Sequence, residues 1–217
     1  MRPAAVLFDC DGVIVDSEGI GVDHITAEVA ALGMGLERRA VEELFVGKTL
    51  PGVARTLAAE GHPIPDGWTR GVYERLYARL AEGTPLIEGI EAVLDALDGA
   101  GIPYAVGSNG ETRKMHTTLP QHPGVWARVK NRLYSGQELG CPKPDPGLYR
   151  HAARELGVDP AACVVVDDSP SGCLAGVAGG IRTLGFAEHD DGARLAAVGA
   201  EVFHRMADLP GLIGLGR

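Results

Sequence analysis

Four short polar segments carry the residue types that do chemistry in this 217-residue chain. They are Asp9-Cys10-Asp11-Gly12, Ser108-Asn109-Gly110, Lys143-Pro144-Asp145-Pro146 and Asp167-Asp168-Ser169. Each is expected where a strand of a parallel sheet ends. Because the ligands of such sheets bind outside the carboxyl ends of the strands, we expect the four segments to converge in one crevice.

The side chains of this crevice suit phosphoryl transfer. Crowded carboxylates repel one another and are costly to bury, and Mg²⁺, with positions left for water and phosphate, would relieve the repulsion. Asp9 could attack phosphorus to give an aspartyl-phosphate. Asp11 would protonate the leaving oxygen and later deprotonate the attacking water. Ser108 and the backbone N–H groups after Asn109 would hold the phosphoryl oxygens. Lys143 would offset charge shared by the nucleophile and the phosphate.

Each assignment has a structural alternative. The first two segments are also compatible with ordinary turns and helix caps, and Lys143 with a solvated surface position. Of Asp167 and Asp168, at least one is expected to bind the metal, and the other has the alternative of capping the next helix. Lys48 and Thr49 are candidates for further substrate contacts, with an exposed loop as the alternative. The presence of all four segments together favours the chemical interpretation.

Hydrophobic patterning predicts the elements that must position these segments. Apolar runs predict strands at 4–8, 103–106, 132–134, 163–166, 181–184 and 201–203. Amphipathic stretches predict helices between them. From residue 85 onward strand and helix alternate, which predicts a Rossmann-like α/β core with a parallel sheet covered on both faces.

One interval in this pattern is too long for a single crossover. The strand that ends at Asp9 and the strand that ends at Ser108 are 108 − 9 = 99 residues apart, whereas a βαβ unit takes roughly 30. The residues between are helical in pattern, with helices expected at 17–32, 41–45, 53–60 and 68–81. We therefore predict an α/β core domain of residues 1–16 and 85–217 and an inserted α-helical domain of residues 17–84.

Composition excludes several classes of partner. Lys and Arg number 20 and Asp and Glu 29, a formal net charge of −9, which argues against nucleic-acid and anionic-membrane binding. No apolar run approaches the roughly 18 residues of a membrane span, and no signal peptide is expected. The four cysteines lack CxxC or zinc-site spacing, so we expect reduced thiols. These observations favour a cytoplasmic protein. As a partner we expect a small-molecule phosphate ester, and we expect a monomer.

In order and spacing the four segments resemble the motifs of the haloacid dehalogenase superfamily, over about residues 5–186. The helical insert resembles the small α-helical cap of its β-phosphoglucomutase-like branch. The resemblance implies that Asp9 is the nucleophile and Asp11 the general acid and base. It also implies that Ser108 and Lys143 contact the phosphoryl group.

The same resemblance implies a Mg²⁺ site. Its ligands would be Asp9, the backbone carbonyl of Asp11, and Asp168 with or without Asp167. In many relatives the first member of the acidic pair is Glu. Because Asp167 is one methylene shorter, direct binding and binding through water both remain open for it.

Two features of the chain discriminate among the chemistries of this superfamily. The acid at position 11 favours phosphoester chemistry over dehalogenation, because a halide leaves without a proton. Mutases carry a histidine twelve residues after the nucleophile and an arginine in the first cap loop. Here Gly21 stands at the first position, and residues 46–50 contain no arginine. We therefore expect hydrolysis of a sugar or polyol phosphate, with a sugar-phosphate mutase as the alternative. A non-catalytic phospho-acceptor is a further alternative, but receiver proteins carry their acidic pair before the acceptor aspartate.

Overall fold

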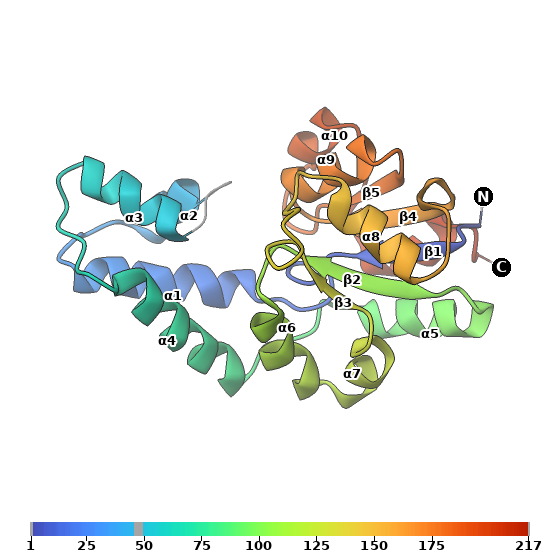
Figure 1. The fold of residues 1–217 in the computed structure, drawn as a ribbon, viewed down its shortest axis with the longest axis horizontal. Helices are drawn as coiled ribbons and strands as arrows, with labels where there is room; N and C mark the ends of the chain where they lie inside the picture. Colours follow the sequence, from blue (N-terminus) through green and yellow to red (C-terminus); the bar gives the residue numbers. More distant parts are fainter. Residues whose placement is uncertain (1, 46–49, 217) are drawn as a thin grey trace. The chain divides into compact units, whose positions relative to one another are not determined.

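The computed structural model describes residues 2–45 and 50–216, and Figure 1 shows its fold. The chain divides into two compact units. One is the helical segment Ser17–Thr84. The other is an α/β unit made of the residues up to Asp16 and those from Pro85 onward.

The α/β unit is built on a parallel sheet of six strands in the order β3-β2-β1-β4-β5-β6. The strands are β1 (Ala5–Phe8), β2 (Tyr104–Ser108), β3 (Leu133–Ser135), β4 (Cys163–Asp167), β5 (Arg182–Phe186) and β6 (Glu201–Phe203). The central strands β1, β2 and β4 are buried throughout, as their unbroken apolar runs require when both faces of a sheet are covered. The predicted parallel α/β fold is confirmed.

Register brings the ends of the three central strands level with one another. Phe8 of β1 lies opposite Val106 of β2 on one side and Val166 of β4 on the other. The chain runs from β1 through β2 to β3 on one side of β1 and then crosses to β4 on the other. The strand order therefore reverses between β1 and β4. Open α/β sheets bind ligands at such a point, outside the carboxyl ends of the strands.

Helices cover both faces of the sheet (Figure 1). One face carries α5 (Ile90–Ala100), α6 (Thr112–Thr118), α7 (Pro123–Val129) and α11 (Leu209–Leu212), which share one apolar cluster with the sheet. The other carries α8 (Gly147–Glu155), α9 (Pro170–Ala178) and α10 (Ala193–Ala197). Three short 3₁₀ turns complete the unit, at Leu119–Gln121, Pro160–Ala162 and Met206–Asp208. Helix α7 was not predicted from the sequence, because it is short and begins with Pro-Gly, a turn signal.

The α/β unit is interrupted at two points that lie side by side. Val15 and Leu86 form an antiparallel bridge. The backbone N–H of Asp16 donates to the carbonyl of Pro85 at 2.9 Å, and that of Ile87 donates to the carbonyl of Ile14 at 3.0 Å. The segment that leaves this unit is thus paired with the segment that returns to it.

The helical unit consists of α1 (Glu18–Ala31), α2 (Arg38–Phe45), α3 (Leu50–Ala59) and α4 (Trp68–Glu82). Its own apolar cluster contains Ile25, Val29, Val41, Val53, Leu57, Trp68 and Val72. The guanidinium of Arg75 on α4 donates two hydrogen bonds of 2.6 Å to the carboxylate of Glu28 on α1. Lys48 and Thr49, the predicted substrate contacts of this region, lie outside the described residues.

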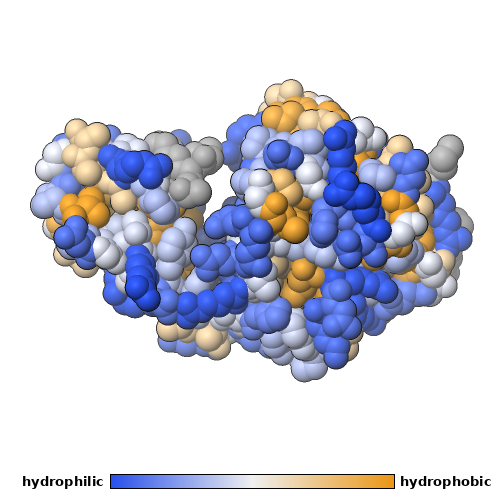
Figure 2. Space-filling model, viewed as in Figure 1, coloured by the Kyte–Doolittle hydropathy of each residue, from blue (hydrophilic) through white to orange (hydrophobic). Residues whose placement is uncertain are grey.

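The face of the molecule in Figure 2 is predominantly polar. In the view of Figure 2, hydrophobic residues of the α/β unit form small separate patches among hydrophilic ones. The large apolar side chains that are exposed, among the described residues, are Leu139, Leu174, Val177 and Leu212. A bilayer-crossing helix needs a long apolar stretch, and none of the helices described here has both the length and the hydropathy for it.

Candidate active site

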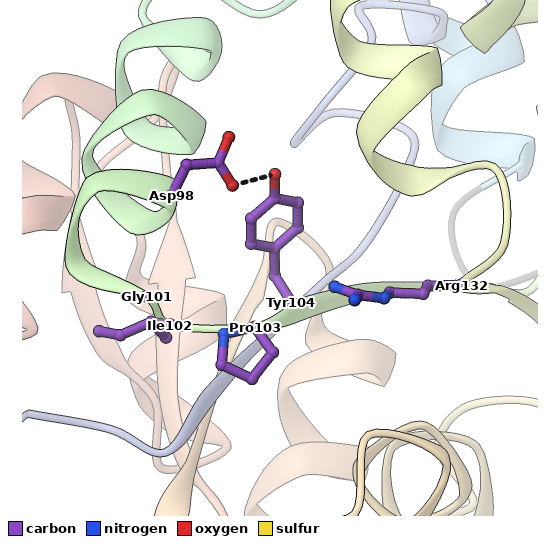
Figure 3. A pocket seen from close by; sticks show the side chains of 6 residues that line it. All are labelled: Asp98, Gly101, Ile102, Pro103, Tyr104 and Arg132. Atoms are coloured by element: carbon purple, nitrogen blue, oxygen red, sulfur yellow. Dashed lines mark hydrogen bonds between the residues drawn. The ribbon is translucent and has the colours of Figure 1, made fainter.

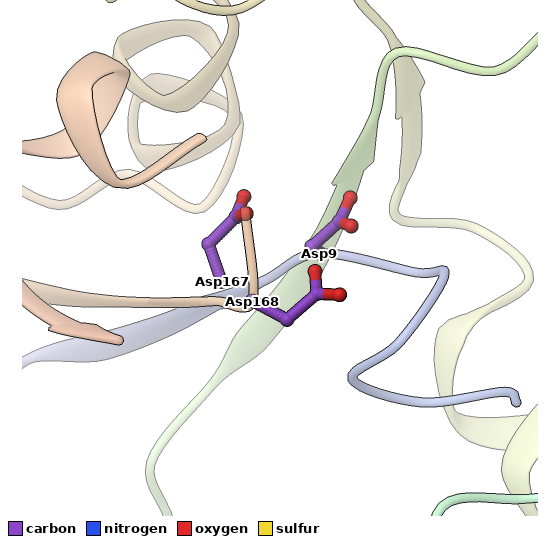
Figure 4. Close-up of side chains that lie close together, drawn as sticks. All are labelled: Asp9, Asp167 and Asp168. Carbon is purple, nitrogen blue, oxygen red and sulfur yellow. The ribbon is translucent and has the colours of Figure 1, made fainter. Parts of the chain in front are cut away.

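Three carboxylates gather where β1 and β4 end (Figure 4). Asp9 follows β1, Asp167 is the last residue of β4, and Asp168 comes next. Each offers an oxygen within 4.8 Å of those of the other two, a spacing that suits a metal ion. Asp9 and Asp167 are buried, and Asp168 is half-buried. Parallel register therefore assembles this cluster from segments more than 150 residues apart in the chain (167 − 9 = 158).

Lys143 lies between two of these carboxylates. Its ammonium Nζ is 2.6 Å from Oδ1 of Asp9 and 2.8 Å from Oδ2 of Asp167, and its side chain is 3% exposed. Burial lowers the pKa of Lys143, but the charges of Asp167 and Asp9 more than offset this and raise it. The side chain is therefore a buried cation at any working pH.

The sequence pattern led us to expect the Lys143 loop directly after a strand, but the structure does not place it there. It lies 143 − 135 = 8 residues beyond the end of β3 at Ser135. Asn109 fastens it: the Asn109 amide donates to the carbonyl of Lys143 at 3.0 Å and accepts from its N–H at 2.7 Å. These hydrogen bonds of the Asn109 side chain position the lysine loop. The predicted contact of Asn109 with phosphate stays a prediction.

Asp167 is held from several directions at once. The backbone N–H and the hydroxyl of Ser169 donate to its Oδ1, at 2.9 and 2.7 Å. The hydroxyl of Tyr149 donates to its Oδ2 at 2.5 Å. Burial and the charge of Asp167 raise the pKa of the Tyr149 hydroxyl, which therefore stays a donor. Ser169 also accepts from the N–H of Gly172 and so caps α9.

Asp11 faces a cation that the sequence analysis did not identify. Lys114 of α6 places its Nζ 2.8 Å from Oδ1 of Asp11, and both side chains are about a fifth exposed, at 23% and 21%. Burial lowers the pKa of Lys114, but the charge and hydrogen bond of Asp11 outweigh this and raise it. Ser108 is buried nearby at the end of β2, and its hydroxyl accepts from the N–H of Gly110 at 2.9 Å.

Sequence reasoning missed Lys114 and the hydroxyl of Tyr149. Nothing in its type or spacing distinguishes Lys114 from a solvated helix residue. Tyr149 was placed correctly on the inward face of its helix, and a signal was available there, since a buried tyrosine hydroxyl needs a hydrogen-bond partner.

The cluster carries more negative than positive charge. Asp9 and Asp167 share the ammonium of Lys143, and Asp168 adds a third carboxylate beside them. Burial raises the pKa of Asp9 to about 7; Lys143 opposes the shift, and Asp167 and Asp11 add to it. A divalent cation among hard oxygen donors would remove this excess, so the donor set fits Mg²⁺.

A second depression lies at the opposite edge of the sheet (Figure 3). It measures about 280 Å³ and is lined by Asp98, Gly101, Ile102, Pro103, Tyr104 and Arg132, near the amino end of β2. The Tyr104 hydroxyl donates to Asp98 at 2.9 Å. Because ligands of parallel α/β sheets bind at the carboxyl edge, the carboxylate cluster is the candidate active site.

Comparison with known proteins decides the family. Residues 3–180 match the model of the haloacid dehalogenase-like hydrolases. The chain belongs to this family. It is therefore a hydrolase, and the resemblance on which the sequence prediction rested is confirmed.

Two relatives that match along most of the chain are named as phosphatases. The 6-phosphogluconate phosphatase of Escherichia coli is 30% identical over 213 residues, which span 97% of this chain and 95% of the relative. Hexitol phosphatase A of the same organism is 30% identical over 200 residues, 91% and 89% of the two chains. The prediction of an enzyme of phosphatase type agrees with these names.

Solved structures with the same fold include two bacterial proteins. A haloacid dehalogenase-like protein of unknown function from Agrobacterium tumefaciens has a TM-score of 0.85 at 30% identity, covering 97% of each chain. A family hydrolase from Deinococcus radiodurans, solved with bound phosphate and sodium, has a TM-score of 0.82 at 33% identity, covering 99% of this chain and 97% of its own.

The raised pKa of Asp9 predicts how metal-free stability changes with pH. An unfolded Asp has a pKa near 3.9, so between about pH 4 and pH 7 the folded protein holds a proton that the unfolded chain has released. The stabilisation of the folded protein that this proton provides is complete below about pH 4 and is lost as pH rises through about 7. Melts in a chelator should therefore show a Tm that falls from pH 5 to pH 8, by about 3 °C or more beyond any fall in Asp9→Asn.

Added Mg²⁺ should raise the Tm of the wild type more at pH 8 than at pH 5, because it favours the ionised carboxylate. An equal fall in Tm in wild type and Asp9→Asn would show that another group is responsible.

Gly172 allows the first turn of α9 to lie against the Asp167 carboxylate. A Cβ there would be 1.8 Å from Oδ2 and 2.0 Å from Cγ of Asp167. Gly172→Ala should therefore destabilise the protein by about 2 kcal/mol, the usual scale of overpacking. The matched control is Gly99→Ala on α5, where a Cβ would meet nothing within 4 Å and which should stabilise by up to ~1 kcal/mol. Urea unfolding of both variants measures the difference, and similar stabilities would contradict the close approach.

Proposed function

We propose that the protein is a Mg²⁺-dependent phosphatase that hydrolyses a small sugar or polyol phosphate through an aspartyl-phosphate on Asp9. The observation that carries the proposal is the buried carboxylate of Asp9, held by Lys143 beside two further carboxylates at the switch point of the sheet. Support comes from the activities named for the Escherichia coli relatives and from the phosphate bound in the Deinococcus radiodurans hydrolase.

In the first step Asp9 attacks phosphorus, the phosphorus–oxygen bond to the leaving group breaks, and an acyl phosphate forms. Lys143 fixes the attacking carboxylate and balances the charge that the phosphoryl group brings. Ser108 holds a phosphoryl oxygen. Asp9, the carbonyl of Asp11, and Asp168 with or without Asp167 would hold Mg²⁺, which would keep Asp9 ionised and would neutralise charge on the phosphoryl oxygens.

Asp11 provides the proton transfers. As a general acid it protonates the departing alkoxide, and as a general base it then takes a proton from the water that attacks the acyl phosphate. That attack releases inorganic phosphate and regenerates Asp9. Lys114, 2.8 Å from Asp11, holds the Asp11 carboxylate in place between these steps.

The helical unit, residues 17–84, is proposed as the cap domain that chooses the substrate, with Lys48 among its contacts. Exclusion of bulk water by such a cap would protect the acyl phosphate from uncontrolled hydrolysis. Gly21 stands where mutases carry histidine, so hydrolysis is preferred to phosphate transfer within a sugar.

A panel of phosphorylated sugars, polyols and sugar acids, scored for released inorganic phosphate, tests the proposal. Wild type should release phosphate with Mg²⁺ and not after chelation. Asp9→Asn should be at least about 1000-fold slower, since no nucleophile remains. Asp98→Asn, at the depression on the opposite edge, is the matched control and should keep full activity. Turnover of Asp9→Asn near the wild-type rate would refute the nucleophile assignment.

The leaving group tests the role of Asp11. An alkoxide needs a proton to depart, whereas a nitrophenolate does not. Asp11→Asn should therefore lower kcat/KM for a sugar phosphate by about 100-fold or more and lower it much less for p-nitrophenyl phosphate. Because kcat/KM reports the steps up to the first irreversible one, slow hydrolysis of the acyl phosphate does not obscure the comparison. Equal losses on both substrates would contradict general acid catalysis by Asp11.

A further inference from the structure

The carboxylate of Asp167 has no acceptor position left. Two donors from Ser169 occupy Oδ1, at 2.9 and 2.7 Å. Lys143 and Tyr149 occupy Oδ2, at 2.8 and 2.5 Å. An ionised carboxylate has about four lone-pair sites, and here four donors take them. A cation bound to Asp167 would have to displace one of these donors.

The donors are themselves fixed. Tyr149 is fully buried on α8, and its ring packs in the apolar layer with Leu7 and Ala105 of the sheet. A buried hydroxyl that loses its partner is destabilising. Displacing Lys143 instead would bury an ammonium with one carboxylate fewer to balance it. Neither Oδ2 donor leaves without loss of stability.

The carboxylate cannot easily swing toward another position. The backbone of α9 lies against it at Gly172, where even a Cβ would overlap its oxygens at 1.8 and 2.2 Å. Asp167 is also completely buried. Protein-bound Mg²⁺ usually keeps several waters, so the ion itself needs a side open to solvent, and no part of Asp167 reaches solvent.

Asp168 differs from Asp167 in exposure, because it is half-buried rather than buried. Its carboxylate lies against the loop that follows Asp9, where a Cβ on Gly12 would be 2.1 Å from Oδ2 of Asp168. Asp168 and Asp9 thus offer oxygens close to each other at the ends of adjacent strands.

We propose that Asp167 is not a metal ligand but a positioning residue, which Tyr149 and Ser169 hold in place to direct Lys143 onto Asp9, and that Asp9 and Asp168 are the carboxylates that bind the metal. Tyr149 contacts both Asp167 and Lys143. Its hydroxyl donates to Asp167, and the Lys143 ammonium lies 5.0 Å from the centre of its ring. The inference rests on the proposed Mg²⁺ chemistry and names which side chains serve it.

Mn²⁺ binding, followed by the electron paramagnetic resonance of the free ion, tests the ligand assignment without turnover. Asp167→Asn and Asp168→Asn are matched, because each removes one negative charge from the cluster. Asp168→Asn should weaken Mn²⁺ binding about tenfold more than Asp167→Asn does. Crystals soaked in Mn²⁺ should show the ion bonded to Asp9 and Asp168. Equal losses of affinity, or an ion bonded to Asp167, would overturn the assignment.

Tyr149→Phe tests positioning with the ring retained. It should leave Mn²⁺ affinity within about twofold of wild type and weaken inhibition by inorganic phosphate at least about fivefold, because Asp167, which directs Lys143, loses one of its donors. General loosening of the site would weaken both ligands together, so that pattern, or an unchanged phosphate constant, overturns the positioning role. If wild type binds neither Mn²⁺ nor phosphate, the proposed function fails as well. If it binds both and Asp167→Asn behaves as Asp168→Asn, only this inference fails.

Discussion

The site depends on a buried ammonium shared between two buried carboxylates. Lys143, Asp9 and Asp167 come from a loop and two strands, and their charges are almost fully removed from water. Desolvation makes such a group unfavourable unless its geometry is accurate and every remaining hydrogen-bonding position is filled. Much of the surrounding architecture meets that requirement: Asn109 fastens the lysine loop, and Ser169 and Tyr149 fill the positions on Asp167.

The sheet provides the accuracy. A parallel register that pairs Phe8 with Val166 brings the residues after it into contact without any adjustable loop. Helix α9 can then start against Asp167 only because its first turn contains Gly172. The proposed metal binding rests on the same arrangement. It brings Asp168 beside Asp9 and Asp167, and a divalent cation would complement the negative charge of this cluster.

The sequence was sufficient for the fold and for the residues of the site that come directly from strand ends. Apolar runs predict strands, and the carboxyl ends of parallel strands share an edge, so the proximity of Asp9 and Asp167 follows from pattern alone. Contacts made through loops and helix faces do not follow. The burial of Tyr149 was predictable but its partner was not, because the direction of a hydroxyl depends on packing in three dimensions. Lys114 carries no mark in the sequence, and the amide of Asn109 serves a loop 34 residues away (143 − 109 = 34).

Val15 and Leu86 pair through their backbones, and the N–H of Asp16 donates to the carbonyl of Pro85. This pairing has a consequence for how such a chain can evolve. The ends of the inserted helical segment are held together by the α/β unit itself. An insert of a different length therefore changes the closure entropy only slowly, and the strands on either side need not move. The helical unit, which we propose selects the substrate, can therefore be exchanged as a module while the carboxylate cluster is inherited intact, so one proposed catalytic centre can come to serve many metabolites.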